Sequence, residues 1–421
     1  MFRLHDAQLG QTSWNQWQGR CGHQPQIRGT QIFTLVLDVH CESFSAIAPD
    51  VIDKKSQISI LAASVKAYVA FERLIETGEI FVRTEHLKYL ACPQCKQTLV
   101  ILEVEKRNSQ SVEAGTLQCS SCRQKYGIVR HIPRFVALEN YASGFGLQWA
   151  IHARTQYDSY SGANISETRF FNETRWPKDL KGQVILEVGS GSGRFTEQAA
   201  STGAMVVSMD YSQAVEANYA SNGDRDNVLI VQGDIYNMPF RENYFDKVLC
   251  IGVLQHTPKV EESFMQLPQY LKPGGEMVID VYRKFAGLLG LLRTRYWVRP
   301  ITRRIPAERL YALVKRYVES MWPISGWISK IPRIGRNLNL ALLIADYRGV
   351  YTLSDEMLRE WAILDTFDKL SPAYDYPQTL ETVKTWFLQT DLINVQVQYG
   401  YNGIEGRGTK AFGFFSELNR K

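Results

Sequence analysis

The sequence predicts an α/β protein built on a doubly wound, largely parallel β-sheet, with a small β-rich module in front of it. From Lys181 onward, short apolar stretches alternate with stretches of helical apolar spacing, a pattern typical of such a sheet. The stretch "VILEVGSGSGRFTEQ" places three glycines at alternate positions directly after an apolar run. Two CxxC pairs lie upstream and define the small module.

The predicted organisation has four parts. Residues 1–85 form an N-terminal segment of unassigned role, for which a helical appendage and a partly disordered arm both remain open. Residues 86–137 form the cysteine module, where "LVILEVEK" and "GTLQC" are expected strands joined by a polar loop. Residues 138–180 are an aromatic, partly helical lead-in. Residues 181–421 form the main domain, with a basic helical insert at 283–348.

The main domain carries five expected strands in "QVILEVG", "AMVVSMD", "VLIVQGD", "FDKVLCIG" and "GEMVIDVY". Between them, helices are expected in "FTEQAAST", "SQAVEANYAS" and "EESFMQLPQYL". Two further strands are expected in the tail, in "INVQVQYG" and "AFGFFSEL". In the insert, a helix is expected to begin near Pro306, with one apolar face made by Leu310, Leu313, Tyr317 and Met321.

Charge is distributed unevenly along the chain. The net charge of +5 over 421 residues does not by itself indicate a nucleic-acid-binding protein. Residues 283–348, however, hold 14 Lys/Arg and 3 Asp/Glu, so this segment carries +11 and the rest of the chain −6. The first residues lack an apolar signal core, and no apolar run reaches the ~18 residues of a membrane span. A cytoplasmic protein without transmembrane segments is the expectation.

The CxxC pairs predict a metal site. Cys92, Cys95, Cys119 and Cys122 follow a Cx2C-x23-Cx2C spacing, which suits four thiolates around one tetrahedral zinc ion. Redox pairs or disulfides are the alternatives, but paired spacing in a reducing compartment favours zinc. Because four protein ligands leave no open position, the expected zinc is structural.

The glycine-rich stretch predicts a ligand site without a pyrophosphate. A dinucleotide fingerprint would place its third glycine where Arg194 stands, one residue after Gly193. Glu187, two residues before Gly189, can face an ammonium group, and the backbone of the three glycines, including Gly191, can approach a carboxylate and a ribose.

Two further acids end the next two strands. Asp210 lies 17 residues after Gly193 and can accept hydrogen bonds from ribose hydroxyls, while Asp234 can accept one from an adenine amino group. With these residues in this order, the chain resembles a class I S-adenosylmethionine-dependent methyltransferase over about residues 181–282. The resemblance implies a seven-stranded sheet and S-adenosylmethionine contacts from Glu187, Gly189, Gly191, Gly193, Asp210, Tyr211, Asp234 and Ile235.

The cysteine module has a resemblance of its own. "LACPQCKQTL", "LQCSSCRQKYGI" and "HIPRF" are similar to the zinc ribbon of the small partner protein of tRNA, rRNA and release-factor methyltransferases. The likeness covers roughly residues 87–136, and the CxxC pairs are its specific part.

Candidates for a catalytic base follow the fourth and fifth strands. His256 in "GVLQHTP" and Tyr282 in "IDVY" lie where the methyltransferase family faces its acceptor, and a role in shaping the pocket stays open for both. Cys250 is expected in the core. The loop "CIGVLQ" stands where adenine N-methylating enzymes carry an Asn/Asp-Pro-Pro-Tyr/Phe motif, so that acceptor chemistry is not expected.

Three functions fit these observations. The first is methyl transfer to a small or carrier-bound metabolite, such as a quinone, lipid, sugar or secondary metabolite. The second is RNA methylation, with the basic insert binding phosphates. The third is a non-enzymatic S-adenosylmethionine-binding adaptor, which the intact set of acids disfavours. For the insert, a helical cap on the sheet is favoured over peripheral contact with an anionic membrane. The later stretch "TFDKLSPAYDYPQTLETVKTWF" is expected to line the acceptor pocket.

Overall fold

The computed structural model describes residues 84–107, 111–137, 140–285 and 293–412, all within one unit of the chain, Glu79–Lys421. The predictions for residues 1–83 and for most of "AFGFFSEL" lie outside these ranges. Among the described residues, no helix is long and apolar enough to cross a membrane.

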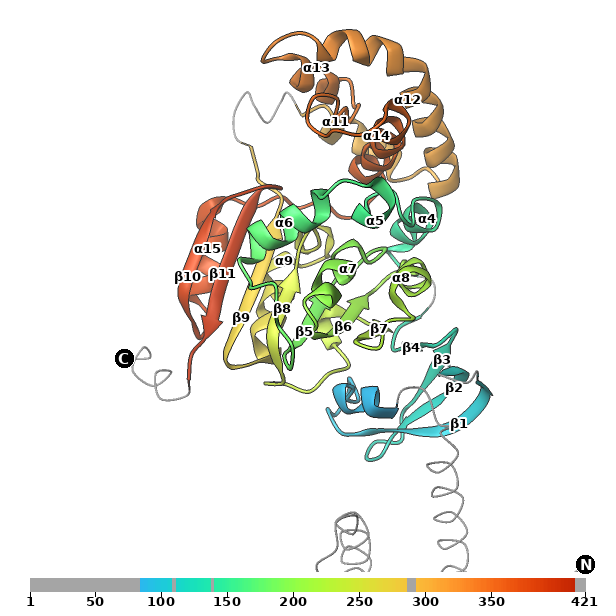
Figure 1. Ribbon diagram of the computed structural model, residues 1–421, viewed down its shortest axis with the longest axis vertical. Coiled ribbons are helices and arrows are strands. Elements are labelled where there is room, and N and C mark those ends of the chain that lie inside the picture. The colour runs from blue at the N-terminus through green and yellow to red at the C-terminus, as the bar shows by residue number, and fades with distance from the viewer. Residues whose placement is uncertain (1–83, 108–110, 138–139, 286–292, 413–421) are drawn as a thin grey trace, which may run out of the picture. The chain divides into compact units, whose positions relative to one another are not determined.

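The main domain holds seven strands in the spatial order β7-β6-β5-β8-β9-β11-β10 (Figure 1). The first five in this order pair in parallel, whereas β11 is antiparallel to both β9 and β10. This confirms the predicted doubly wound, mostly parallel sheet, whose order reverses at β5. The strands are β5 Val184–Val188, β6 Met205–Asp210, β7 Val228–Gln232, β8 Phe245–Cys250, β9 Leu271–Val281, β10 Leu392–Tyr399 and β11 Ile404–Lys410.

Alternate residues of the central strands feed two separate cores, as the period of two in a strand requires. Ile185 packs with Phe170 and Phe195 of helices α6 (Ile165–Thr174) and α7 (Arg194–Ser201). α8 (Val215–Asn222) completes this layer. On the other face, Leu186 belongs to the cluster that contains Phe264 of α9 (Val260–Gln266) and residues of α15 (Leu380–Leu388).

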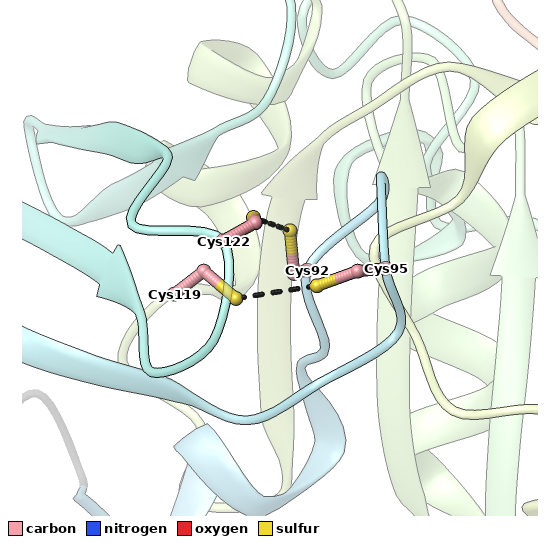
Figure 2. Close-up of side chains that lie close together, drawn as sticks. All are labelled: Cys92, Cys95, Cys119 and Cys122. Atoms are coloured by element: carbon pink, nitrogen blue, oxygen red, sulfur yellow. Dashed lines mark hydrogen bonds between the residues drawn. The ribbon is translucent and has the colours of Figure 1, made fainter.

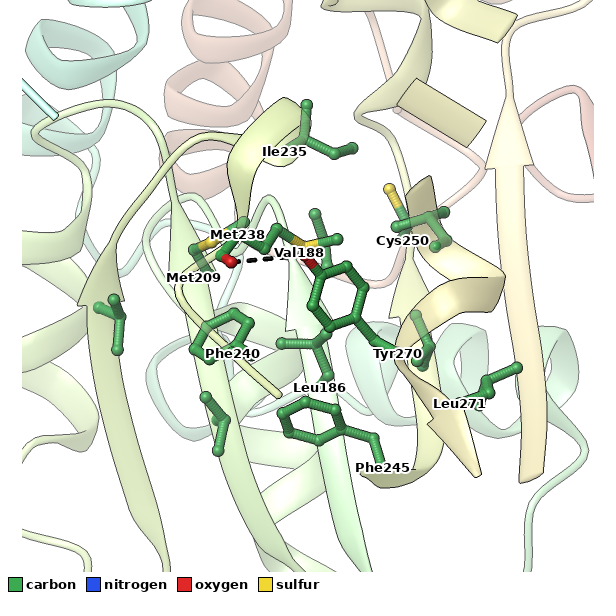
Figure 3. Packing of buried hydrophobic residues seen from close by; sticks show 14 of the residues in the cluster. Leu186, Val188, Met209, Ile235, Met238, Phe240, Phe245, Cys250, Tyr270 and Leu271 are labelled. Carbon is green, nitrogen blue, oxygen red and sulfur yellow. Dashed lines mark hydrogen bonds between the residues drawn. The ribbon is translucent and has the colours of Figure 1, made fainter. Parts of the chain in front are cut away.

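Part of the second cluster is drawn in Figure 3, which shows Leu186, Met209, Met238, Phe240 and Cys250 among its members. Cys250 is fully buried in this cluster, which confirms its predicted place in the core.

The cysteine module contains four strands rather than the two predicted. They are β1 Leu99–Arg107, β2 Val112–Cys119, β3 Lys125–Val129 and β4 Ile132–Arg134, preceded by the 3-10 helix η1 Thr84–Tyr89. β2 begins inside the predicted polar loop, because Val112 is buried at its start while the polar residues after it lie partly exposed. The module also joins the main sheet, which the sequence analysis did not foresee. β4 pairs in parallel with β7 through Arg134 and Gln232, so one sheet contains eleven strands.

The insert and the segment after it form a helical layer with its own core. This layer contains α11 Arg295–Thr302, α12 Ala307–Ser329, α13 Gly335–Ala341 and α14 Asp355–Leu370, and Figure 1 shows these helices grouped together. The core joins residues of α12 and α14, among them Leu310, Val314, Val318, Trp322, Leu358, Ala362 and Phe367.

The predicted apolar face of α12 was wrong except at Leu310, the one predicted residue that is buried. The buried residues are Leu310, Val314, Val318, Trp322 and Ser325, whereas Leu313 is 57% and Tyr317 38% exposed. The physical reason is that α14 packs against only one face of α12 and leaves the neighbouring apolar stripe uncovered.

In the tail, β10 confirms the strand predicted in "INVQVQYG". The structure also contains a strand that was not predicted, β11, formed by "IEGRGTK"; of "AFGFFSEL" only Ala411 and Phe412 are described, and neither is in a strand. Because glycine has a low propensity for strands, the residue types of β11 did not predict one. A Cβ at Gly406 would lie 2.4 Å from the ring of Phe387 on α15, so a side chain there would collide with the covering helix.

The lead-in also contains two shorter helices. α4 (Ser143–Ile151) and α5 (Asp158–Ser161) precede α6, and α4 contacts both α8 and α14. The lead-in therefore connects the sheet to the helical layer.

Candidate active site

A cavity of about 570 Å³ lies where the parallel strands end at their carboxyl termini. Its lining includes seven of the predicted site residues: Gly189, Gly191, Asp210, Tyr211, Ile235, His256 and Tyr282. The volume falls in the usual range for a small-molecule site. Three other predicted residues, Glu187, Gly193 and Asp234, are not part of the lining.

Close packing alone requires glycines in the loop after β5, independently of any ligand. All three of its glycines have positive φ, +82° at Gly189, +55° at Gly191 and +94° at Gly193. A Cβ at Gly189 would lie 2.2 Å from Val253, and one at Gly193 would lie 2.1 Å from the side-chain oxygen of Asn218. The loop after β8 and helix α8 thus press on the glycine backbone, which a side chain would push away.

Glu187 lies behind this loop in a buried polar network. Its Oε2 accepts hydrogen bonds from the hydroxyls of Thr196, at 2.5 Å, and Ser208, at 3.0 Å. Asn218 donates to both hydroxyls from α8. Burial raises the pKa of Glu187 to about 7, although the two hydroxyl donors oppose the rise. Its contact with an ammonium group stays a prediction.

Asp210 ends β6 and ties the glycine loop to the following turn. Its Oδ2 accepts from the Gly191 N–H at 2.8 Å, and its Oδ1 accepts from the Ser212 N–H at 2.8 Å and hydroxyl at 2.7 Å. Burial raises its pKa above the ordinary value, against the lowering effect of these donors. The carboxylate therefore organises the loop and also lines the cavity, where it can accept from ribose hydroxyls.

Of the residues predicted to bind adenine, Ile235 lines the cavity and Asp234 does not. Asp234 caps the short 3-10 helix η2 (Ile235–Asn237) by accepting from the Tyr236 N–H at 3.0 Å. Ile235 is buried and lines the cavity. Tyr211 also lines it, with its ring stacked on Tyr141 at 4.8 Å between centroids.

His256 has a defined tautomer in the cavity wall. It ends the 3-10 helix η3 (Leu254–His256), and its Nδ1 lies 3.0 Å from the carbonyl oxygen of Tyr374. Because a carbonyl only accepts, Nδ1 carries the proton and the neutral ring keeps Nε2 as an acceptor. The rings of Phe145 and Tyr282 pack edge-on against the imidazole. This tautomer is the one a general base needs.

Tyr282 is suited to donate a hydrogen bond rather than to accept a proton. Burial, with a further contribution from Asp368, raises the pKa of its phenol well above the ordinary value. The hydroxyl lies 3.4 Å from Oδ2 of Asp368. The phenol consequently stays protonated at neutral pH.

An internal ion pair positions the loop after β8. Arg169 on α6 donates from Nη2 to Asp280 at 2.7 Å and from Nε to Glu173 at 2.6 Å. Asp280, fully buried near the end of β9, accepts the Gly252 N–H with its other oxygen. Burial raises the pKa of Glu173 to about 7, with the charge of Asp280 adding to the effect. Arg169 itself lines the cavity beside the glycine loop.

Much of the remaining cavity lining could not be predicted from the sequence. Cationic groups come from α7 (Arg194), from α11 and the residues before it (Arg295 and Arg293), and from α14 (Lys369). Aromatic rings come from Trp149, Tyr347, Tyr351, Trp361, Tyr399 and Tyr401. These segments are far apart in sequence, so no local pattern could unite them. Asp368 and Lys369 do belong to the stretch that was expected to line the acceptor pocket.

Lys369 and Arg194 lack full partners among the described residues. Burial, followed by the charges of Arg295 and Arg293, lowers the pKa of Lys369 despite the opposing effect of Asp365. Its Nζ makes no hydrogen bond or ion pair with any described residue. Burial lowers the pKa of Arg194 to about 10, and its Nε has no hydrogen-bond partner within the described ranges. Arg194 stays positive at neutral pH, so this part of the cavity lining can receive an anionic group.

The four predicted cysteine ligands lie together (Figure 2). Their sulfur atoms are all within 4.8 Å of one another, with Cys92 to Cys122 at 3.6 Å and Cys95 to Cys119 at 3.4 Å. All four thiols are free. A tetrahedral zinc with Zn–S bonds of ~2.3 Å would set sulfur atoms about 3.8 Å apart, so the donor set fits this ion.

The two CxxC turns have the same backbone design. Lys96 N–H donates to the carbonyl of Cys92 at 2.8 Å, and Arg123 N–H donates to that of Cys119 at 3.2 Å. Lys96 and Arg123 both take the left-handed conformation, with φ of 57° and 63°. Each turn thereby directs its two thiols toward the other pair.

The module is anchored to the main domain by several contacts. Ala91 N–H donates to the carbonyl of Pro239 at 2.8 Å, and Lys96 Nζ donates to the carbonyl of Met238 at 2.8 Å. Buried residues of both parts, including Leu117 and Phe240, belong to a single apolar cluster. The cysteine module and the sheet therefore share a core.

Two family models match the sequence of this chain. Residues 186–279 match a model described as a methyltransferase domain, and residues 83–130 match one described as Trm112p-like protein. The chain thus carries a methyltransferase domain joined to a Trm112p-like domain.

Relatives of the methyltransferase domain differ in their acceptors. A sterol 24-C-methyltransferase of Saccharomyces cerevisiae is 36% identical over 104 residues, which cover 24% of this chain and 27% of the relative. A tRNA U34 carboxymethyltransferase of Ruthia magnifica subsp. Calyptogena magnifica is 32% identical over 109 residues, covering 24% of this chain and 34% of the relative. The chain spans only about a quarter of the length of the first of these relatives.

Among solved structures, a complex of the Haloferax volcanii Trm112 methyltransferase activator with a methyltransferase resembles this chain. It has 19% identity and a TM-score of 0.31, over 40% of this chain and 69% of that one.

Proposed function

We propose that this protein is an S-adenosylmethionine-dependent methyltransferase that acts on a small or carrier-bound metabolite by in-line displacement. The observation that carries the proposal is one cavity whose lining contains the glycine loop and Asp210 together with the aromatic and cationic residues of the helical layer. One site can then hold the methyl donor and its acceptor side by side, and positioning alone contributes much of such catalysis.

S-adenosylmethionine would supply an electrophilic methyl group on a sulfonium. In the proposed site, Asp210 accepts from the ribose hydroxyls, and Ile235 and Tyr211 contact the adenine. Arg169 and Arg194 bring positive charge beside the glycine loop, where the carboxylate of the methionine moiety is expected. Glu187, with its raised pKa, would ionise when an ammonium group binds near it.

We further propose that the acceptor carries an anionic group, such as a carboxylate or a phosphate. Lys369, Arg293 and Arg295 line the cavity together with Asp365 and Asp368, and burial lowers the pKa of the lysine. A bound anion would offset the cost of burying the positive charge of Lys369. The aromatic rings around them suit an apolar body attached to the anionic group.

His256 is the proposed general base for an acceptor that must lose a proton. Its Nε2 is the free acceptor of the neutral ring, since Nδ1 donates to the carbonyl of Tyr374. An acceptor that is already nucleophilic would not need this step. The zinc proposed for the four cysteines would stabilise the ribbon without an open coordination position.

RNA methylation remains the second candidate, because the Trm112p-like ribbon and the basic insert occur in one chain. The unpaired cations inside a cavity rimmed by tyrosines favour a compact acceptor over a phosphate backbone.

The test is a transfer assay with S-adenosylmethionine labelled in the methyl group. Carboxylated and phosphorylated amphiphiles would be compared with their neutral analogues and with RNA. Labelling of anionic small acceptors, lost in Lys369→Met and kept in Lys125→Met on exposed β3, is the expected result. Labelling of RNA alone would overturn the proposal, and failure to bind S-adenosylhomocysteine would overturn the methyltransferase assignment itself.

A further inference from the structure

An apolar stripe on the outer surface of the helical layer is not covered by the residues that the structure describes. On α12, Leu313 is 57%, Ile324 51% and Trp327 80% exposed. With the 38% exposed Tyr317 these residues are spaced at i, i+4, i+11 and i+14, so they share one face of the helix. This face is separate from the buried one that packs against α14.

Helix α13 and the turn before it extend the stripe. The Tyr317 hydroxyl donates to the carbonyl of Leu342 at 2.6 Å, which holds the end of α13 beside this face of α12. Ile331, Ile334 and Leu338 are 41%, 53% and 40% exposed in the same turn and helix. The apolar surface therefore spans two helices, which is more than the scattered exposed residues of an ordinary protein surface.

Exposed cations accompany this surface without balancing acids. Eight of them lie between residues 303 and 336, and none forms an ion pair with a described residue: Arg303, Arg304, Arg309, Lys315, Arg316, Lys330, Arg333 and Arg336. The only acidic residues in this stretch are Glu308 and Glu319.

We propose that α11, α12 and α13 form a docking surface for an anionic lipid membrane. A helix that presents tryptophan and aliphatic residues together with lysine and arginine lies in the interfacial region of a bilayer, where apolar burial and charge attraction add. An RNA partner would use the cations but leave Trp327 and Ile324 in water, and a protein partner would need acids to match eight cations. An anionic membrane accounts for both features.

The surface borders the cavity. α11 contributes Arg295 to the cavity lining, while Trp297 and Ile301 on the same helix are 64% and 66% exposed. Docking through these residues would bring the acceptor end of the cavity to the lipid headgroups. This surface extends the proposed function but does not depend on methyl transfer, because membrane binding can be measured without any acceptor.

The first experiment measures co-flotation of the full chain with vesicles of phosphatidylcholine alone or with phosphatidylglycerol. Binding is expected only to the anionic vesicles. The double variant Ile324→Ser/Trp327→Ser should reduce the bound fraction about tenfold. The matched control is Leu388→Ser on α15, a residue 82% exposed outside this surface, which should bind as the unaltered chain does.

The second experiment tests the charges. Arg303→Ala/Arg304→Ala should reduce binding to anionic vesicles about tenfold, whereas Lys181→Ala/Arg241→Ala, which changes two exposed cations elsewhere, should not. Circular dichroism of each variant confirms folding. The proposal is overturned by absent vesicle binding, by equal loss in either control, by RNA binding that alone responds to the variants, or by a dimer that the serine variant dissociates.

Discussion

Replacing Asp210 by Asn tests whether this side chain both builds the glycine loop and binds the cofactor. The carboxylate accepts from two backbone N–H groups, Gly191 on one oxygen and Ser212 on the other, each at 2.8 Å. An amide offers one oxygen and one NH₂ group. Whichever way it turns, one of the two N–H groups then faces another donor.

The expected loss of folding free energy is about 1–3 kcal/mol, the cost of one partly buried donor left without its acceptor. Part of the cost is offset because burial already disfavours the charged form, as the raised pKa of Asp210 indicates. Affinity for S-adenosylhomocysteine should fall a further ~10–100-fold, since the ribose loses a charged acceptor.

Urea unfolding and titration calorimetry separate the two effects. Asp224→Asn, at an exposed position, is the matched control and should change neither quantity. Unchanged stability of Asp210→Asn would refute the role in the loop, and unchanged affinity would refute the ribose contact.

Three further changes follow from the site. Glu187→Gln should be about 1–3 kcal/mol more stable than the unaltered chain at pH 8 and equally stable at pH 4. The reason is that a carboxyl whose pKa is raised to about 7 stabilises the fold fully below pH 4.5, and this stabilisation is lost as the pH rises through 7. Parallel pH–stability curves of the two proteins would refute the raised pKa. His256→Gln should lower the turnover rate about 10²–10⁴-fold with cofactor affinity kept, and an unchanged rate would exclude the base. The chain is expected to carry one zinc, measured by elemental analysis, and Cys119→Ser should lose it and lower the unfolding midpoint of the main domain. An unaltered midpoint would mean that the module is independent of the main domain.

The parts of the fold that were predictable are those in which neighbouring residues carry the signal. The strands β5 to β9 each combine an apolar run with a following turn, and the glycine spacing locates the loop after β5. The CxxC spacing located the thiols that the structure brings within 4.8 Å of one another.

The remaining features depend on contacts between distant segments. β11 could not be recognised because Gly406 leaves room for Phe387, a requirement that only the packed helix reveals. The exposed face of α12 depends on which side α14 covers. The cationic end of the cavity joins Arg194 to Lys369, residues 175 positions apart, and their common site is set by the helical layer rather than by any motif.

Gln232 connects the ribbon through hydrogen bonds to Tyr211, a residue of the cavity lining. This fully buried side chain accepts from Arg134 Nη1 of the ribbon at 2.7 Å and donates from Nε2 to the carbonyl of Tyr211 at 3.1 Å. Its backbone carbonyl accepts from the Phe135 N–H at 2.9 Å. If loss of the metal displaced Arg134, the buried amide of Gln232 would lack a partner on one side. Zinc bound far from the cavity would therefore support the position of Tyr211, so the metal and the cofactor site are expected to be coupled through one sheet edge.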